Sequence, residues 1–175
     1  LMKILLLAND IDWKTLPRRV KELELYLMGR LHFMHEELTI DIKHVKTDIY
    51  PDRTGYLDQA WIQNRMIKTN PTYDAVGMLI NPDQWKSSGG QKGCGGGYVR
   101  DNDMKFGFYV ISGEKQTVKR KGGKRRKAFE LFFEHEFAGH GISHDLGLKW
   151  GSNEDHSFRK GYDNTHYFFY NSKLD

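Results

Sequence analysis

Two histidines and a glutamate lie close together in one short segment, His135-Glu136-Phe137-Ala138-Gly139-His140. Imidazole nitrogens are frequent ligands of protein-bound zinc, and a hydrolytic zinc site also needs a carboxylate that accepts a proton from water. The usual arrangement places the two histidines four residues apart on one helical face, with the glutamate directly after the first. This segment has the same residue types but one additional residue between the histidines. It therefore predicts a zinc site only if the helix is distorted.

The additional residue decides which histidines can share an ion. On a regular α-helix each residue turns by about 100°, so His135 and His140 would diverge by roughly 140°. A π-bulge absorbs one residue, and such bulges are frequent at functional sites. Gly139 lies in the interval, where a backbone distortion is sterically least costly. We therefore predict a π-bulge near Ala138 and Gly139, with His135 and His140 as zinc ligands and Glu136 as the general base.

A third zinc ligand is expected after the helix. His144 is our first choice, because Gly141 can end the helix and let the chain turn back toward the metal. His166 is the alternative third ligand, and Tyr167 beside it would then help to stabilise an oxyanion.

A second register needs no bulge. His140 and His144 are four residues apart and would share one face of a regular helix. Gly141 would then stand where the catalytic glutamate belongs, and Glu136, one turn before His140, would be a substitute base or a ligand. We favour the bulged register because it keeps Glu136 directly after a ligand.

The pattern resembles the zinc motifs of two groups of peptidases. His-Glu-x-x-Gly-His, from His135 to His140, resembles the inserted motif of the dipeptidyl peptidase III family, in which both histidines bind zinc and the glutamate is the base. The Gly-His pair, followed by His144, is similar to the motif of metzincins and of archaemetzincin-like proteins in particular. The spacing differs from that of metzincins on both sides of His140. Metzincins also have a Met-turn methionine after the motif, whereas the last methionine here, Met104, precedes it. The resemblance implies a zinc metallopeptidase that acts on a protein or peptide.

Length and composition indicate one globular domain over residues 1–175. Hydrophobic residues make up 38% and charged residues 29% of the chain, which is typical of a protein with a buried core. A single cysteine, Cys94, excludes an internal disulfide framework and favours a reducing compartment. The apolar run at 4–8 is too short for a signal-peptide core, and no run is long enough to span a membrane. We expect a cytoplasmic protein without membrane contact.

Strand and helix patterns alternate along the chain. Their order implies right-handed crossovers and a mainly parallel twisted sheet. Metzincin-like domains share this order of elements, and in them an edge strand precedes a buried zinc helix. We expect Gly97-Tyr98-Val99-Arg100 in such an edge strand and a glycine-rich flap over 87–97. The fold class is therefore predicted as a single α/β domain with flanking helices and a buried zinc-binding helix. Apolar patterns predict strands at 4–8, 38–42, 75–80 and 106–111, and helices at 16–34, 56–69 and 126–140.

A basic run, Lys119–Lys127, contains seven lysines and arginines around two glycines. It either contacts nucleic acid or an acidic partner, or is a solvated hairpin or loop. It also places positive charge at the beginning of a predicted helix, against the helix dipole, so helix stability does not explain it. The basic run gives one rival function, a nucleic-acid-binding protein with structural histidines. A second rival, independent of this run, is a zinc-binding protein without peptidase activity.

Overall fold

The structure is a computed structural model, and it describes residues 2–30, 37–52, 55–87, 94–101, 105–119 and 125–142. Within these ranges no helix has the length and apolar character needed to cross a membrane. His144, His166, Tyr167 and residues 120–124 of the basic run lie outside them.

Helices and strands alternate through the described part of the chain. Two of the helices change from α to π geometry along their length, and the π segments are named η2 and η3. In chain order the elements are β1 (Met2–Asn9), α1 (Leu16–Arg30), β2 (Leu38–Val45), α2 (Gln59–Trp61), η2 (Ile62–Ile67), β3 (Ala75–Ile80), α3 (Pro82–Ser87), β4 (Gly95–Arg100), β5 (Phe106–Ile111), β6 (Thr117–Lys119), β7 (Arg125–Lys127), α4 (Ala128–Glu134) and η3 (His135–Ile142).

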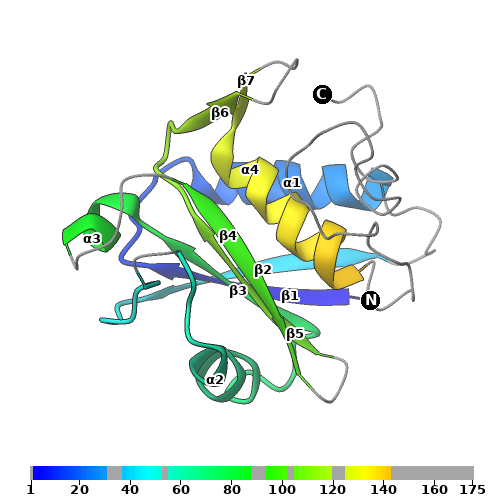
Figure 1. Cartoon of the computed structure of the whole chain (residues 1–175). Helices are drawn as coiled ribbons and strands as arrows, with labels where there is room; N and C mark the ends of the chain where they lie inside the picture. The colour runs from blue at the N-terminus through cyan, green and yellow to red at the C-terminus, as the bar shows by residue number, and fades with distance from the viewer. Residues whose placement is uncertain are drawn as a thin grey trace, which may run out of the picture.

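The main sheet has five strands in the order β2-β1-β3-β5-β4 (Figure 1). β1 pairs in parallel with β2 and with β3, and β3 pairs in parallel with β5. The connections through α1 and α2 are strand–helix–strand crossovers, which make neighbouring strands parallel. β4 runs antiparallel to β5 at one edge. The prediction of an α/β fold with a mainly parallel sheet and an edge strand is confirmed.

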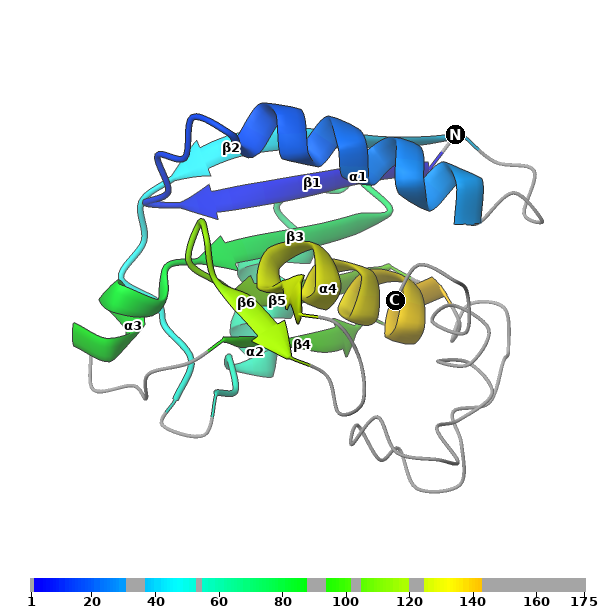
Figure 2. The ribbon, with the colours of Figure 1, turned by 90° about the horizontal axis from the view of Figure 1, so that it is seen from above.

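The sheet separates two apolar cores. α1 and α4 lie on one face and α2 lies on the other, as the view from above also shows (Figure 2). Alternate residues of the buried strands point to opposite faces, so in β1 Ile4 and Leu6 join the core beneath α1 and α4, whereas Leu5 and Leu7 join the core beneath α2. Burial on both faces is why these strands are continuous apolar runs in the sequence.

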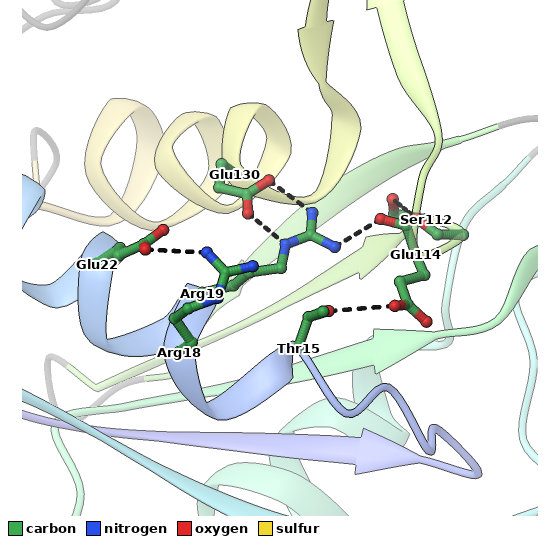
Figure 3. Close-up of polar contacts among 8 residues, drawn as sticks. Thr15, Arg18, Arg19, Glu22, Ser112, Glu114 and Glu130 are labelled. Atoms are coloured by element: carbon green, nitrogen blue, oxygen red, sulfur yellow. Dashed lines mark hydrogen bonds and ion pairs between the residues drawn. The ribbon is translucent and has the colours of Figure 1, made fainter.

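A buried arginine ties α4 to α1 (Figure 3). Arg19 of α1 donates two hydrogen bonds to the carboxylate of Glu130 in the first turn of α4, at 2.6 and 2.8 Å, and a third to the carbonyl of Glu114. Its guanidinium also lies 5.1 Å from the ring centroid of Trp13 and 5.3 Å from that of Phe129. Paired and stacked in this way, the buried charge of Arg19 fixes where α4 begins.

Three predicted elements differ in the structure. The helix expected over 126–140 begins at Ala128, after strand β7, and continues past Gly141 to Ile142. The helix expected over 56–69 begins at Gln59, because the Asp58 side chain accepts a hydrogen bond from the amide of Trp61 and caps it there. Residues 88–93 of the flap expected over 87–97 lie outside the described residues. The prediction is wrong for its last three glycines, which form the beginning of β4. Their pairing with β5 was not visible in the sequence, since glycine has low strand propensity.

Candidate metal centre

The helix that begins with α4 changes its hydrogen-bonding period at the predicted position. From His135 to Ile142 it is a π-helix, so the predicted π-bulge is confirmed and extends over eight residues. Five residues make slightly more than one turn of a π-helix, which returns residues i and i+5 to one face. The rings of His135 and His140 are accordingly neighbours, with centroids 4.9 Å apart and planes at 81°.

The carboxylate of Glu136 lies near the Nε2 atoms of both rings. One of its oxygens is 3.8 Å from Nε2 of His135, and the other is 3.8 Å from Nε2 of His140. One ligand atom from each residue lies within 4.8 Å of the other two. His135 and Glu136 are buried, at 3% and 5% exposure, and His140 is partly buried. The structure therefore brings the three predicted residues of the bulged register into one cluster.

Burial determines the electrostatics of this cluster. Loss of contact with water raises the pKa of Glu136 to about 8, because a charged carboxylate is poorly solvated there. The two imidazoles lie beyond ordinary hydrogen-bond distance at 3.8 Å and do not offset this cost. A cation placed among the three groups would offset it, since it would attract the carboxylate and accept both imidazole lone pairs.

Edge strand β4 forms the wall opposite η3. A Cβ added to Gly96 would lie 2.7 Å from the carbonyl oxygen of Tyr109 and 2.9 Å from Cγ of Glu136, so glycine permits the close approach of β4 to Glu136. Two residues on, the ring of Tyr98 stacks on that of His140, with centroids 5.7 Å apart and planes at 12°. Strand β4 therefore contacts both the carboxylate and one histidine.

The pairing of β4 with β5 determines which main-chain groups of β4 point outward from the sheet. The amide of Asp101 donates to the carbonyl of Lys105 at 2.7 Å where the β4–β5 hairpin closes. Bonded and non-bonded pairs alternate along an antiparallel ladder, so the main-chain groups of Gly96 and Tyr98 point away from β5. The edge expected at residues 97–100 is thus present from Gly95 and lies beside the cluster.

A tyrosine supports β4 from the opposite face of the sheet. The hydroxyl of Tyr109 donates to the carbonyl of Gly55 at 2.9 Å and accepts from the amide of Leu57 at 3.2 Å. Burial raises the pKa of Tyr109 to about 12. The ring packs directly against Gly97, where a Cβ would overlap it. Glycines 96 and 97 thus admit one close neighbour on each face of the strand.

The cluster could hold a metal ion. The two imidazoles are ligands that zinc uses, and the neighbouring Glu136 carboxylate, which belongs to the same helix, is placed to act as the base of the bulged register. The two candidates for a third histidine ligand, His144 and His166, both lie outside the described residues. The choice between them therefore stays a prediction.

Other predicted features have more ordinary surroundings. Burial raises the pKa of the Cys94 thiol, which directly precedes β4. In the basic run, Lys119 of β6 lies directly opposite Arg125 of β7, and both side chains are exposed. Arg126 points to the other side of this ribbon and lies 4.0 Å from the carboxylate of Glu134.

Sequence reasoning missed Gly96, and it placed Tyr98 in the edge strand but not beside His140. Gly96 and Tyr98 share one face of β4, and it is this face that packs on η3. The two-residue spacing was a usable signal, but only after the glycine run had been assigned to a strand.

Searches of protein-family models, of curated proteins and of solved structures gave no significant match to this chain.

Proposed function

We propose that this protein is a zinc-dependent endopeptidase. The observation that carries the proposal is the π-helical placement of His135 and His140, five residues apart, with the Nε2 atom of each 3.8 Å from the Glu136 carboxylate. In this proposal the two histidines are zinc ligands, and His144 is the third ligand, with His166 as the alternative.

Zinc held by these residues would polarise the scissile carbonyl and lower the pKa of a coordinated water to about 7. Glu136 is the residue that would take a proton from the attacking water and return it to the leaving amine. A cation beside Glu136 would lower the pKa that burial raises, which would keep the carboxylate able to accept a proton near neutral pH. Burial also excludes bulk water from around the carboxylate.

The edge of β4 is the proposed binding surface for the peptide substrate. Main-chain groups of Gly96 and Tyr98 point outward beside the cluster, and an extended peptide can add to such an edge as a further strand. A substrate strand there would pass directly in front of Glu136, which contacts β4 at Gly96.

The test measures metal and activity separately. Protein purified without added metal should contain about one zinc per chain by elemental analysis. Glu136→Gln keeps the shape of the side chain but cannot accept a proton, so hydrolysis of a peptide library should fall about 100-fold or more while zinc is retained. Glu22→Gln, on the exposed face of α1, is the matched control and should leave both unchanged. Unchanged hydrolysis by a zinc-loaded Glu136→Gln protein would remove Glu136 from the mechanism.

One observation favours the nucleic-acid-binding alternative. Lys119 and Arg125 are direct cross-strand partners in the β6–β7 ribbon, and like charges in that position are destabilising. A polyanion would relieve this repulsion. Salt-dependent binding of a duplex oligonucleotide by a protein that contains no zinc would favour this alternative, and zinc without peptide cleavage would favour a zinc-binding protein that is not a peptidase.

A further inference from the structure

The ring of Tyr98 contacts two other rings. It meets Phe106 of β5, with centroids 5.6 Å apart and planes at 54°, and it stacks nearly parallel on His140. Phe106 in turn packs against Gly141, where an added Cβ would overlap its ring. The aromatic contact therefore runs from β5 through the edge strand to the histidine.

We propose that Tyr98 is a positioning residue that raises the zinc affinity of the site by holding the imidazole of His140. This inference rests on the metal centre proposed above and adds a residue that is not itself a ligand. His140 is the more exposed of the two histidines, and the other, His135, is almost fully buried. The ring of His140 is thus the one that gains most from a neighbour that restricts its rotation.

Two physical effects make the stack favour the metal-bound state. A ring held in place before zinc arrives loses less conformational freedom on binding, which is the general benefit of preorganisation. Coordination also withdraws electron density from the imidazole, and the negatively polarised face of a tyrosine ring attracts an electron-poor neighbour. Both effects require the aromatic ring, and neither requires the tyrosine hydroxyl.

The sequence of β4 is arranged to permit this contact. Gly96 allows the strand to approach Glu136, and the alternation of a strand then directs Tyr98, two residues on, to the same face. A side chain at 96 would hold β4 away from η3 and separate the two stacked rings. The glycine and the tyrosine therefore act together, one by allowing the approach and the other by using it.

The experiment compares zinc affinities of the full chain by competition with a chelating indicator. Tyr98→Leu keeps an apolar side chain without a ring and should weaken zinc binding about five- to tenfold. Tyr98→Phe keeps the ring and should bind zinc within about twofold of the parent. Phe129→Leu removes a ring from the same core, where it packs on Phe133 at 6.0 Å, and should lower stability while leaving zinc affinity unchanged.

The outcomes separate this inference from the metal centre itself. Zinc binding by Tyr98→Leu as tight as that of the parent would overturn the role of Tyr98 and leave the centre intact. Equal weakening by Tyr98→Phe and Tyr98→Leu would also overturn it, since the hydroxyl and not the ring would then matter. A parent protein without zinc affinity would overturn both proposals. If Tyr98→Leu does not fold, Tyr98→Met replaces it, and the visible absorption bands of bound Co²⁺ report whether the His140 ligand geometry has changed.

Discussion

One continuous helix contains two halves that differ in geometry and in neighbours. The first half, α4, is α-helical, and its carboxylates face α1: Glu130 is bonded to Arg19, and Glu134 accepts from the hydroxyl of Tyr26 at 3.2 Å. The second half, η3, is π-helical, and its polar groups face β4. Glu136 comes two residues after Glu134, about half a turn around the helix, so it faces the other neighbour, and the change of period brings His140 to the same side as His135.

The distances between polar groups show what each half is suited to do. In the first half the Arg19–Glu130 contacts measure 2.6 and 2.8 Å, so the charges satisfy each other. In the second half the carboxylate of Glu136 stays 3.8 Å from each imidazole. Groups that stabilise a fold are in contact, whereas groups that hold an ion must leave room for it. The two halves differ in this respect, and the predictions below test it.

The largest effect is expected from the histidines of the second half. His135→Ala and His140→Ala should each weaken zinc binding by more than the about 10- to 100-fold that loss of an outer partner causes. Both variants should stay folded, as measured by thermal unfolding monitored by circular dichroism. His44→Ala, on β2 and hydrogen-bonded to the carbonyl of Ile11, is the control and should keep full affinity. Tight zinc binding by His135→Ala would instead restore the register that uses His140 and His144.

A change in the first half should give the opposite result. Arg19→Met leaves the Glu130 carboxylate without its bidentate partner and should lower the free energy of unfolding by about 3 kcal/mol, measured with urea. Zinc affinity of the folded protein should change little, because no ligand comes from this half. Arg18→Met removes the neighbouring exposed pair with Glu22 and should cost less than about 0.5 kcal/mol. Zinc affinity lost in parallel with stability would show that the two halves are not separable.

A smaller effect is expected where β4 meets the second half. Gly96→Ala places a Cβ against the Tyr109 carbonyl and Glu136 Cγ, and overpacking of this kind costs about 1–3 kcal/mol. Because Glu136 is one of the two neighbours that must move, we also expect peptide hydrolysis to fall. Gly29→Ala, in α1 with no atom within 4 Å of the added Cβ, is the matched control and should not destabilise the protein. A Gly96→Ala protein of parental stability and activity would show that β4 does not restrain Glu136.

The smallest effect concerns the opposite face of β4. Tyr109→Phe removes the hydroxyl bonds to Gly55 and Leu57 and should cost about 1 kcal/mol at neutral pH. Because the folded-state pKa of Tyr109 is raised to about 12 from 10, its contribution is complete below pH 10 and is lost as pH rises toward 12. Urea unfolding at pH 8 and pH 11 should therefore show a smaller difference in Tyr109→Phe than in the parent. An equal difference in both would assign the alkaline loss to other groups.

Periodicity predicted the parts of this molecule that depend on local pattern. The strands at 75–80 and 106–111 were expected with these bounds, since continuous apolar runs mark strands buried on both faces. The π segment was expected because one additional residue between His135 and His140 cannot be absorbed by an α-helix. These features were predictable from neighbouring residues alone.

Features that depend on distant partners were not predictable in this way. The pairing of Arg19 with Glu130 joins residues 111 positions apart, and neither has a local pattern that points to the other. The stack of Tyr98 on His140 was hidden for the same reason, because it required the glycine run to be a strand and that strand to lie against η3. The zinc, the base and the third ligand remain predictions of the sequence.

The order of strands in the sheet has a consequence for how the chain folds. β1 is flanked by β2 and β3, so the first three parallel strands are complete once residue 80 has been synthesised. β4 comes before β5 in the chain but pairs only with β5 in the sheet, so it cannot join the sheet until β5 is present. Hairpins form in microseconds, whereas crossovers that join distant strands form slowly. We therefore expect β4 and β5 to dock on β3 as a preformed hairpin, and the wall that faces His140 to be among the last parts of the native structure to appear.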